Sequence, residues 1–225
     1  MKRFYLLLGA VAVVAAVLIW QASRPSSASA PDATDAPAVA ITAADSAFRG
    51  YVLGSDSAPV EVVEYADYEC PFCAQFGAVQ FPDVRRQLIE TGRVRWRFRD
   101  FPLPLHRWGR MAALTVACAS EQGKAWEAMD ALFQRHADWA QRGGDPSGLF
   151  EQRMRDIGLD MNGYRACVDA KRYAGRIEAS RQEGLARSVQ GTPTFFVNGR
   201  LHEFRRGPTS DDFLALVDSL TKSRR

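Results

Sequence analysis

Two cysteines, Cys70 and Cys73, are separated only by Pro71 and Phe72. Two thiols at this spacing can close a small disulfide ring, or open it by attacking another disulfide. If the pair begins a helix that follows a strand, unpaired backbone N–H groups and the helix dipole favour a thiolate at the first cysteine. We therefore expect Cys70 to attack a substrate disulfide, and Cys73, one helical turn further on, to resolve the mixed disulfide.

Zinc sites, copper carriers and structural disulfides also use a Cys-x-x-Cys pair. A zinc site needs two further ligands, usually a second such pair or paired histidines. The other two cysteines are 49 residues apart, and the histidines are scattered singletons: His106, His136 and His202. We therefore expect no metal site, while Cu(I) carriage and a passive disulfide stay open as alternatives to redox exchange.

The residues around the cysteines predict the elements that position them. Val60–Tyr65 is a short β-branched run typical of a strand. Residues 74–90 carry a helical pattern in which Pro82 should bend or interrupt the helix. Residues 93–99 alternate arginine with apolar side chains, as a half-buried strand does. We interpret the arginine side as an edge strand or a solvated face, with a docking surface for an acidic partner as the alternative.

The rest of the chain is predicted to be helical and then to return to strands. Residues 107–187 have a helical pattern almost throughout, and we take their large aromatic side chains as core. Residues 194–197 and 201–204 read as two strands joined by an Asn-Gly hairpin turn, and a final helix covers about 209–220. Strands thus bracket roughly 85 helical residues, which predicts one α/β domain interrupted by an all-helical one.

Four segments occur in an order that resembles a known family: EYADYECPFC (64–73), FPL…H (101–106), CASEQGKAW (118–126) and GTPTFFVNG (191–199). Together they are similar to the DsbA family, and more narrowly to its thioredoxin-like branch in bacterial exported proteins, over about residues 48–222. The resemblance implies a thioredoxin-like fold with an inserted all-helical domain. We place the thioredoxin-like domain at 48–105 and 188–225, and the insertion at 106–187.

The resemblance also implies roles for single residues. Cys70 would be the nucleophile and Cys73 the resolving thiol. Pro193 would be the cis-proline that thioredoxin-like proteins carry beside their active cysteines, and Thr192, just before it, would contact the substrate. A cis bond here would expose the preceding backbone to a substrate peptide, which could pair with it like an added strand.

Two further residues complete the expected site. Glu64 lies six residues before Cys70, where the family often places a buried acid beneath the disulfide. A desolvated carboxyl there would have a raised pKa and could move protons to and from Cys73, whereas the alternative is a surface glutamate at a strand end. Phe72, which we count among the substrate-contacting residues, replaces a histidine of the best-known member, so that member's strongly oxidising potential does not transfer.

Four cysteines allow three pairings, and pairing Cys70 with Cys73 leaves Cys118 and Cys167 as the natural second pair. A bridge between these two would close a loop of about 50 residues, worth on the order of 4 kcal/mol in the chain-entropy model. Members of the branch that this chain resembles often carry such a pair. We interpret it as a structural disulfide, with a second exchange-active pair or free buried thiols as the alternatives.

The N-terminal residues predict export. Lys2 and Arg3 precede an apolar run, Phe4 to Trp20, which is followed by small and polar residues. At 17 residues, or roughly 25 Å, this run is at the short limit for crossing a bilayer. We expect residues 1–20 to be an uncleaved anchor or, alternatively, a cleaved signal peptide, and 21–47 to be a flexible linker. Everything after Trp20 would then be extracytoplasmic, in the periplasm or at the outer face of the inner membrane.

Charge excludes some partners. Three of the 29 basic residues lie within residues 1–30, where no acid occurs, so 26 basic groups face 26 acidic ones in the remainder. This balance gives no reason to expect a nucleic-acid partner.

The leading hypothesis is a monomeric enzyme that donates disulfides to exported proteins through transient mixed disulfides. It would need no cofactor beyond its own redox-active disulfide, and a membrane redox partner would regenerate it. A reductase, an isomerase and a Cu(I)-carrying assembly factor are the rival functions.

Overall fold

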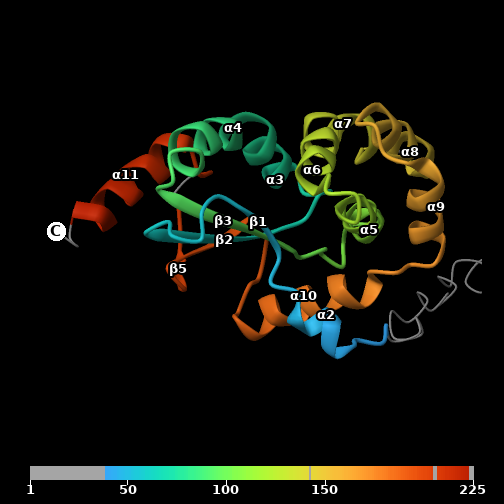
Figure 1. Cartoon of the computed structure of the whole chain (residues 1–225), viewed down its shortest axis with the longest axis horizontal. Helices are drawn as coiled ribbons and strands as arrows, with labels where there is room; N and C mark the ends of the chain where they lie inside the picture. The colour runs from blue at the N-terminus through green and yellow to red at the C-terminus, as the bar shows by residue number, and fades with distance from the viewer. Residues whose placement is uncertain (1–38, 142, 205–206, 223–225) are drawn as a thin grey trace, which may run out of the picture. The chain divides into compact units, whose positions relative to one another are not determined.

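One mixed sheet of five strands organises the part of the chain that the computed structural model describes, residues 39–141, 143–204 and 207–222. The strands lie in the order β1-β3-β2-β4-β5 (Figure 1). β2 and β3 are parallel, and the other neighbouring pairs are antiparallel. The strands are β1 (Tyr51–Leu53), β2 (Val60–Ala66), β3 (Val94–Asp100), β4 (Thr194–Val197) and β5 (Arg200–His202).

Helices cover both faces of this sheet. A helical stretch follows β2 and lies with α11 (Ser210–Lys222) on one face, whereas α10 (Ala174–Ala186) and α2 (Ala43–Ala47) lie on the other (Figure 1). Gly184 lets α10 approach the sheet closely, because a Cβ at this position would lie 2.6 Å from the ring of Phe101. Two covered faces explain why β2, in the middle of the sheet, is buried along almost its whole length.

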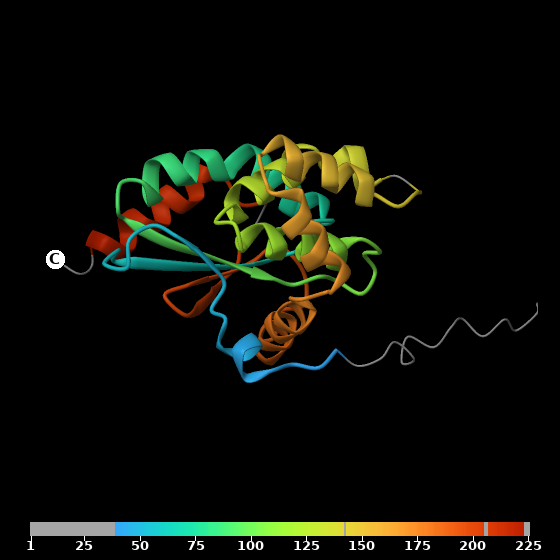
Figure 2. The same cartoon turned by 45° about the vertical axis from the view of Figure 1, so that its right-hand side comes forward.

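The helical block lies between β3 and β4 in sequence, as predicted, and gathers beside one end of the sheet (Figures 1 and 2). A disulfide joins Cys118 to Cys167, with their Cα atoms 5.8 Å apart, and so ties α5 to α9. The aromatic rings of Trp139 and Phe150 pack edge to face in its core. Its helices are α5 (Gly109–Ser120), α6 (Ala125–Gln134), α7 (His136–Trp139), α8 (Ser147–Asp156) and α9 (Met161–Asp169), followed by α10.

The interpretation of residues 93–99 as an edge strand is wrong. β3 lies between β1 and β2, because Tyr51–Leu53, a strand that the sequence analysis does not predict, pairs with its outer side. The arginine side of β3 is not simply solvated either, since Arg99 is buried. These side chains form ion pairs instead: Arg95 with Asp56, Arg97 with Glu61 and Arg99 with Glu183.

The helix after the cysteines is interrupted, as the proline predicts, but by widened turns. The stretch consists of α3 (Pro71–Gln75), the π-helical η1 (Phe76–Gln80), α4 (Phe81–Val84) and the π-helical η2 (Arg85–Ile89). Pro82 lies in the first turn of α4, a position that tolerates proline because the first N–H groups of a helix have no intrahelical acceptor. The wide turn just before it, closed by a bond from Phe81 N–H to the Phe76 carbonyl, gives the proline ring room.

Order also begins earlier than Phe48. α2 is capped by Thr42, whose hydroxyl accepts a hydrogen bond from the backbone N–H of Asp45, and it contacts α10. The last residues assigned to the linker are therefore helical. The predicted anchor or signal, and the linker up to residue 38, lie outside the described residues. Among residues 39–141, 143–204 and 207–222, no helix has the length and apolar character to cross a membrane. The domain boundaries at 105/106 and 187/188 stay a prediction.

Candidate active site

Cys70 lies at the junction between β2 and the helical stretch. It is the N-cap residue of α3, Pro71 is the first helical residue, and the backbone N–H of Cys70 donates to the carbonyl of Asp67 at 3.1 Å. Cys70 and Cys73 are both free thiols, and both are buried. Phe72 between them is 67% exposed.

The two thiols differ sharply in acidity. Hydrogen bonding from the Cys73 thiol is the main cause that lowers the pKa of Cys70 to about 5, and the Thr192 side chain and the backbone at Cys73 and Phe72 add to it against the effect of burial. Burial raises the pKa of Cys73 well above its usual value, and its hydrogen bond to Cys70 raises it further. At neutral pH, Cys70 is therefore a thiolate and Cys73 a thiol.

Glu64 on β2 is the buried acid of this site. It is only 4% exposed, so the alternative of a surface glutamate is excluded. Burial raises the pKa of Glu64 to about 8, and one hydrogen bond, donated by the indole N–H of Trp96 at 3.1 Å, opposes this rise. Its charge also contributes to the raised pKa of Cys73. The two groups are thus close enough to interact electrostatically.

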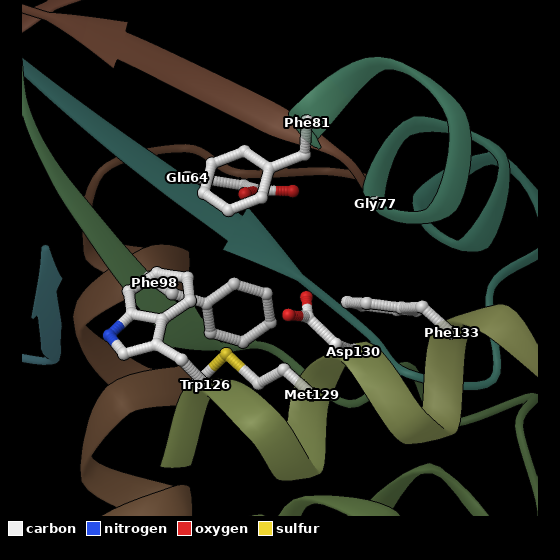
Figure 3. Close-up of a pocket in the computed structure, with 8 residues that line it drawn as sticks. All are labelled: Glu64, Gly77, Phe81, Phe98, Trp126, Met129, Asp130 and Phe133. Atoms are coloured by element: carbon white, nitrogen blue, oxygen red, sulfur yellow. The ribbon is translucent and has the colours of Figure 1, made fainter. Parts of the chain in front are cut away.

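Glu64 borders a small cavity between the sheet and α6, with room for about one water molecule (Figure 3). The walls are mostly aromatic: Phe81, Phe98, Trp126 and Phe133, together with Met129 and Gly77. Asp130 on α6 is the second acid at this cavity. An apolar lining of this kind is the physical reason that the neutral form of Glu64 is favoured.

The Thr192–Pro193 segment lies against the nucleophile. The peptide bond between these two residues is cis, and the thiol of Cys70, when protonated, donates to the carbonyl oxygen of Thr192 at 3.3 Å. Sequence places Cys70 and Thr192 122 residues apart, and the antiparallel pairing of β2 with β4 brings them together. An open groove of about 780 Å³ runs along this segment, lined by Phe72, Thr192, Pro193, Leu201, His202 and Phe204 among others.

Sequence reasoning missed the residues that hold the segment before Cys70. Asp67 is fully buried and contacts His106, and His136 contacts the backbone of Glu69. The two histidines are singletons in sequence, but both contact the four-residue loop 67–70 between β2 and α3. In the described ranges, no group of three His, Cys, Asp or Glu side chains is placed to hold a metal ion.

Comparisons with known proteins agree with this geometry. The family model described as thioredoxin matches residues 47–219. The chain is 30% identical over 153 residues to disulfide bond formation protein D of Bacillus subtilis, covering 67% of this chain and 68% of that protein. The crystal structure of BdbD from Bacillus subtilis (oxidised) superposes with a TM-score of 0.66 at 26% identity, over 76% of this chain and 92% of that one. The fold is thus thioredoxin-like, with an inserted helical domain.

Another relative is much longer. The chain is 41% identical over 155 residues to the Na(+)/H(+) antiporter NhaA 3 of Salinispora tropica, which covers 68% of this chain. The matched stretch is only 22% of that protein, so the chain spans about a fifth of its length.

Proposed function

The chain belongs to the thioredoxin family as a DsbA-like thiol–disulfide oxidoreductase, and we propose that it works in the oxidising direction, donating the Cys70–Cys73 disulfide to protein substrates. The observation that carries this direction is the pKa of Cys70, lowered to about 5 chiefly by hydrogen bonding from Cys73. A stabilised thiolate favours the reduced form of the couple, and it makes Cys70 the better leaving group.

The proposed reaction moves two electrons from the substrate to the chain, and at neutral pH the chain takes up one proton, at Cys73, while Cys70 stays a thiolate. A substrate thiolate attacks the Cys70 sulfur of the oxidised chain, a mixed disulfide forms, and the Cys70–Cys73 bond breaks. The second substrate thiolate then attacks the substrate sulfur of the mixed disulfide, and Cys70 leaves as a thiolate. The products are a substrate disulfide and two reduced cysteines in the chain.

Glu64 would supply the proton that Cys73 needs when it is released as a thiolate. Its pKa of about 8 keeps it protonated at neutral pH, which suits a proton donor to a buried sulfur. In the reverse reaction the same carboxylate would remove the Cys73 proton. Thr192 and Pro193 would contact the substrate backbone, and exposed Phe72 would contact its side chains.

The compartment and partners belong to the same proposal. The apolar run of residues 4–20 supports export to the extracytoplasmic side, with these residues as a signal or a tether. There, disulfides persist, and a membrane redox partner would restore the Cys70–Cys73 bond after each turnover. The name of the Bacillus subtilis relative, disulfide bond formation protein D, supports exchange in this direction. The chain would act as a monomer, without metal or organic cofactor.

An oxidative folding assay tests the direction. The oxidised chain is mixed with a reduced, unfolded ribonuclease in the absence of oxygen, and thiols are counted on both proteins. We expect one substrate disulfide for each oxidised chain, with two thiols appearing at Cys70 and Cys73, because the low pKa of Cys70 favours transfer to the substrate. The pre-reduced chain is the matched control. If the reduced chain opens insulin disulfides while the oxidised chain leaves ribonuclease reduced, the enzyme is a reductase and the proposal is wrong.

A further inference from the structure

The loop between β2 and α3 is held through a buried carboxylate. Asp67, directly after β2, has a side chain with no exposed surface. One of its oxygens accepts from the backbone N–H of Glu69 at 2.9 Å, and the other accepts from the backbone N–H of Leu103 at 2.7 Å. The second oxygen also lies 2.7 Å from Nδ1 of His106. Because a carboxylate only accepts, His106 must carry its proton on Nδ1.

A second histidine holds the same loop from another element. Nε2 of His136, the first residue of α7, lies 2.8 Å from the carbonyl oxygen of Glu69. A carbonyl oxygen is also purely an acceptor, so Nε2 is the donor. The side chain of Glu69 in turn accepts from the backbone N–H of Trp108, at the start of α5. Three contacts from the helical block thus meet on Asp67 and Glu69.

The same loop sets the positions of both active sulfurs. The Asp67 carbonyl accepts from the N–H of Cys70 at 3.1 Å. Burial raises the pKa of Cys73, and a hydrogen bond from the Asp67 backbone opposes this rise. Gly109 lets Asp67 lie close against α5, since a Cβ at position 109 would be 2.6 Å from the Asp67 carboxylate. A shift of Asp67 would therefore move Cys70 away from Thr192 and weaken the contacts that stabilise the thiolate.

We propose that His106 and His136 are positioning residues for the exchange reaction: from two separate elements, they hold the Asp67–Cys70 segment where the Cys70 sulfur meets Thr192 and Cys73. The inference rests on the proposed function of Cys70 as the nucleophile. Neither histidine touches the reacting sulfurs in the contacts described, so each acts through the backbone that it holds. The donated hydrogen, not the imidazole charge, is the feature that matters.

Three substitutions of His106 separate the role of the donated hydrogen from that of the imidazole ring. His106→Ala removes the donor. His106→Asn replaces Nδ1 by an amide nitrogen at nearly the same distance from the backbone, whereas His106→Gln places that nitrogen one methylene farther out. Gln122→Ala is the matched control. Gln122 also joins two loops, through hydrogen bonds with the backbone of Asp160 at 2.8 and 3.0 Å, but it lies within the helical block and away from Cys70.

The readout is the pKa of Cys70, measured in the full chain by the ultraviolet absorbance of its thiolate and by the rate of alkylation against pH. We expect His106→Ala to raise this pKa by about one unit, which leaves about tenfold less thiolate at a pH below it. His106→Asn and Gln122→Ala should keep the wild-type value. If His106→Ala is not recovered folded, the Asn and Gln variants give the same comparison, with only Gln raised.

Each outcome separates the two claims. A wild-type chain whose Cys70 shows no lowered pKa and no exchange would refute the proposed function itself. A wild-type chain that exchanges normally, together with folded His106→Ala and His106→Gln proteins whose Cys70 pKa is unchanged, would refute only the positioning role. His136→Ala, with His136→Gln as its conservative partner, should repeat the pattern of His106, and its failure to do so would restrict the role to His106.

Discussion

Replacing Cys70 with serine is expected to lower the rate of thiol–disulfide exchange by more than about a thousandfold. The serine hydroxyl stays protonated at neutral pH, and it has no sulfur with which to form a mixed disulfide. The fold should survive, since serine has nearly the shape of cysteine and its hydroxyl can donate to the Thr192 carbonyl as the Cys70 thiol does. Loss of thiols from reduced ribonuclease, followed with the Cys70→Ser chain, measures this. Full activity of that variant would contradict the mechanism.

Replacing Cys73 with serine should instead trap the mixed disulfide with the substrate. Cys70 keeps its stabilising contacts from the backbone at positions 72 and 73, so it still attacks a disulfide. Without the resolving thiol, the mixed disulfide persists. We expect a covalent adduct with substrate, visible as a mass increase that a reductant reverses. The double variant Cys70→Ser/Cys73→Ser is the control and should form no adduct.

Replacing Glu64 with glutamine is expected to stabilise the folded chain at high pH. The pKa of Glu64 is raised to about 8 in the folded state from an ordinary value of 4.5. Between these values the unfolded chain has released the proton that the folded chain retains, so the free energy of unfolding falls as the pH rises. Above about pH 8, burial of the ionised carboxylate carries its full cost.

The glutamine side chain keeps the acceptor for Trp96 but never ionises. We therefore expect Glu64→Gln to raise the free energy of unfolding by up to about 5 kcal/mol at pH 9 and by close to nothing at pH 4. The exchange rate at pH 7 should fall by about a hundredfold, since Cys73 loses its proton donor and acceptor. Urea unfolding at the two pH values measures the first effect. An equal change in stability at both would contradict the raised pKa.

The fold could be predicted from the sequence where the signals are local. The β-branched run before the cysteines, the Asn-Gly hairpin and the helical periodicity of residues 107–187 all specify their elements through neighbouring residues. The edge assignment of residues 93–99 failed for a non-local reason. Whether a strand is at an edge depends on its partners, and Tyr51–Leu53, only three residues long, carries too little pattern to predict the strand that covers β3.

The candidate site divides in the same way. Cys70, Cys73 and Pro193 are visible as motifs, and Glu64 is visible through its place in a buried strand. The roles of His106 and His136 are not visible, because the sequence does not show that these two histidines, far apart along the chain, contact the same loop before Cys70. In the sequence, nothing distinguishes Asp67 from any other carboxylate in a loop. Only its burial and its contacts reveal that it anchors the nucleophile's segment.

The reduction potential of the Cys70–Cys73 couple tests the central claim most directly. The chain is equilibrated with mixtures of reduced and oxidised glutathione, and its thiols are counted after an acid quench. The pKa of Cys70, about 5, lies between the values of about 3.5 and 7 that accompany potentials of about −120 and −270 mV in DsbA and thioredoxin. We therefore expect a potential more positive than about −200 mV. A value near −270 mV would mean that the reduced form is not stabilised, and would contradict the proposal that this chain donates disulfides.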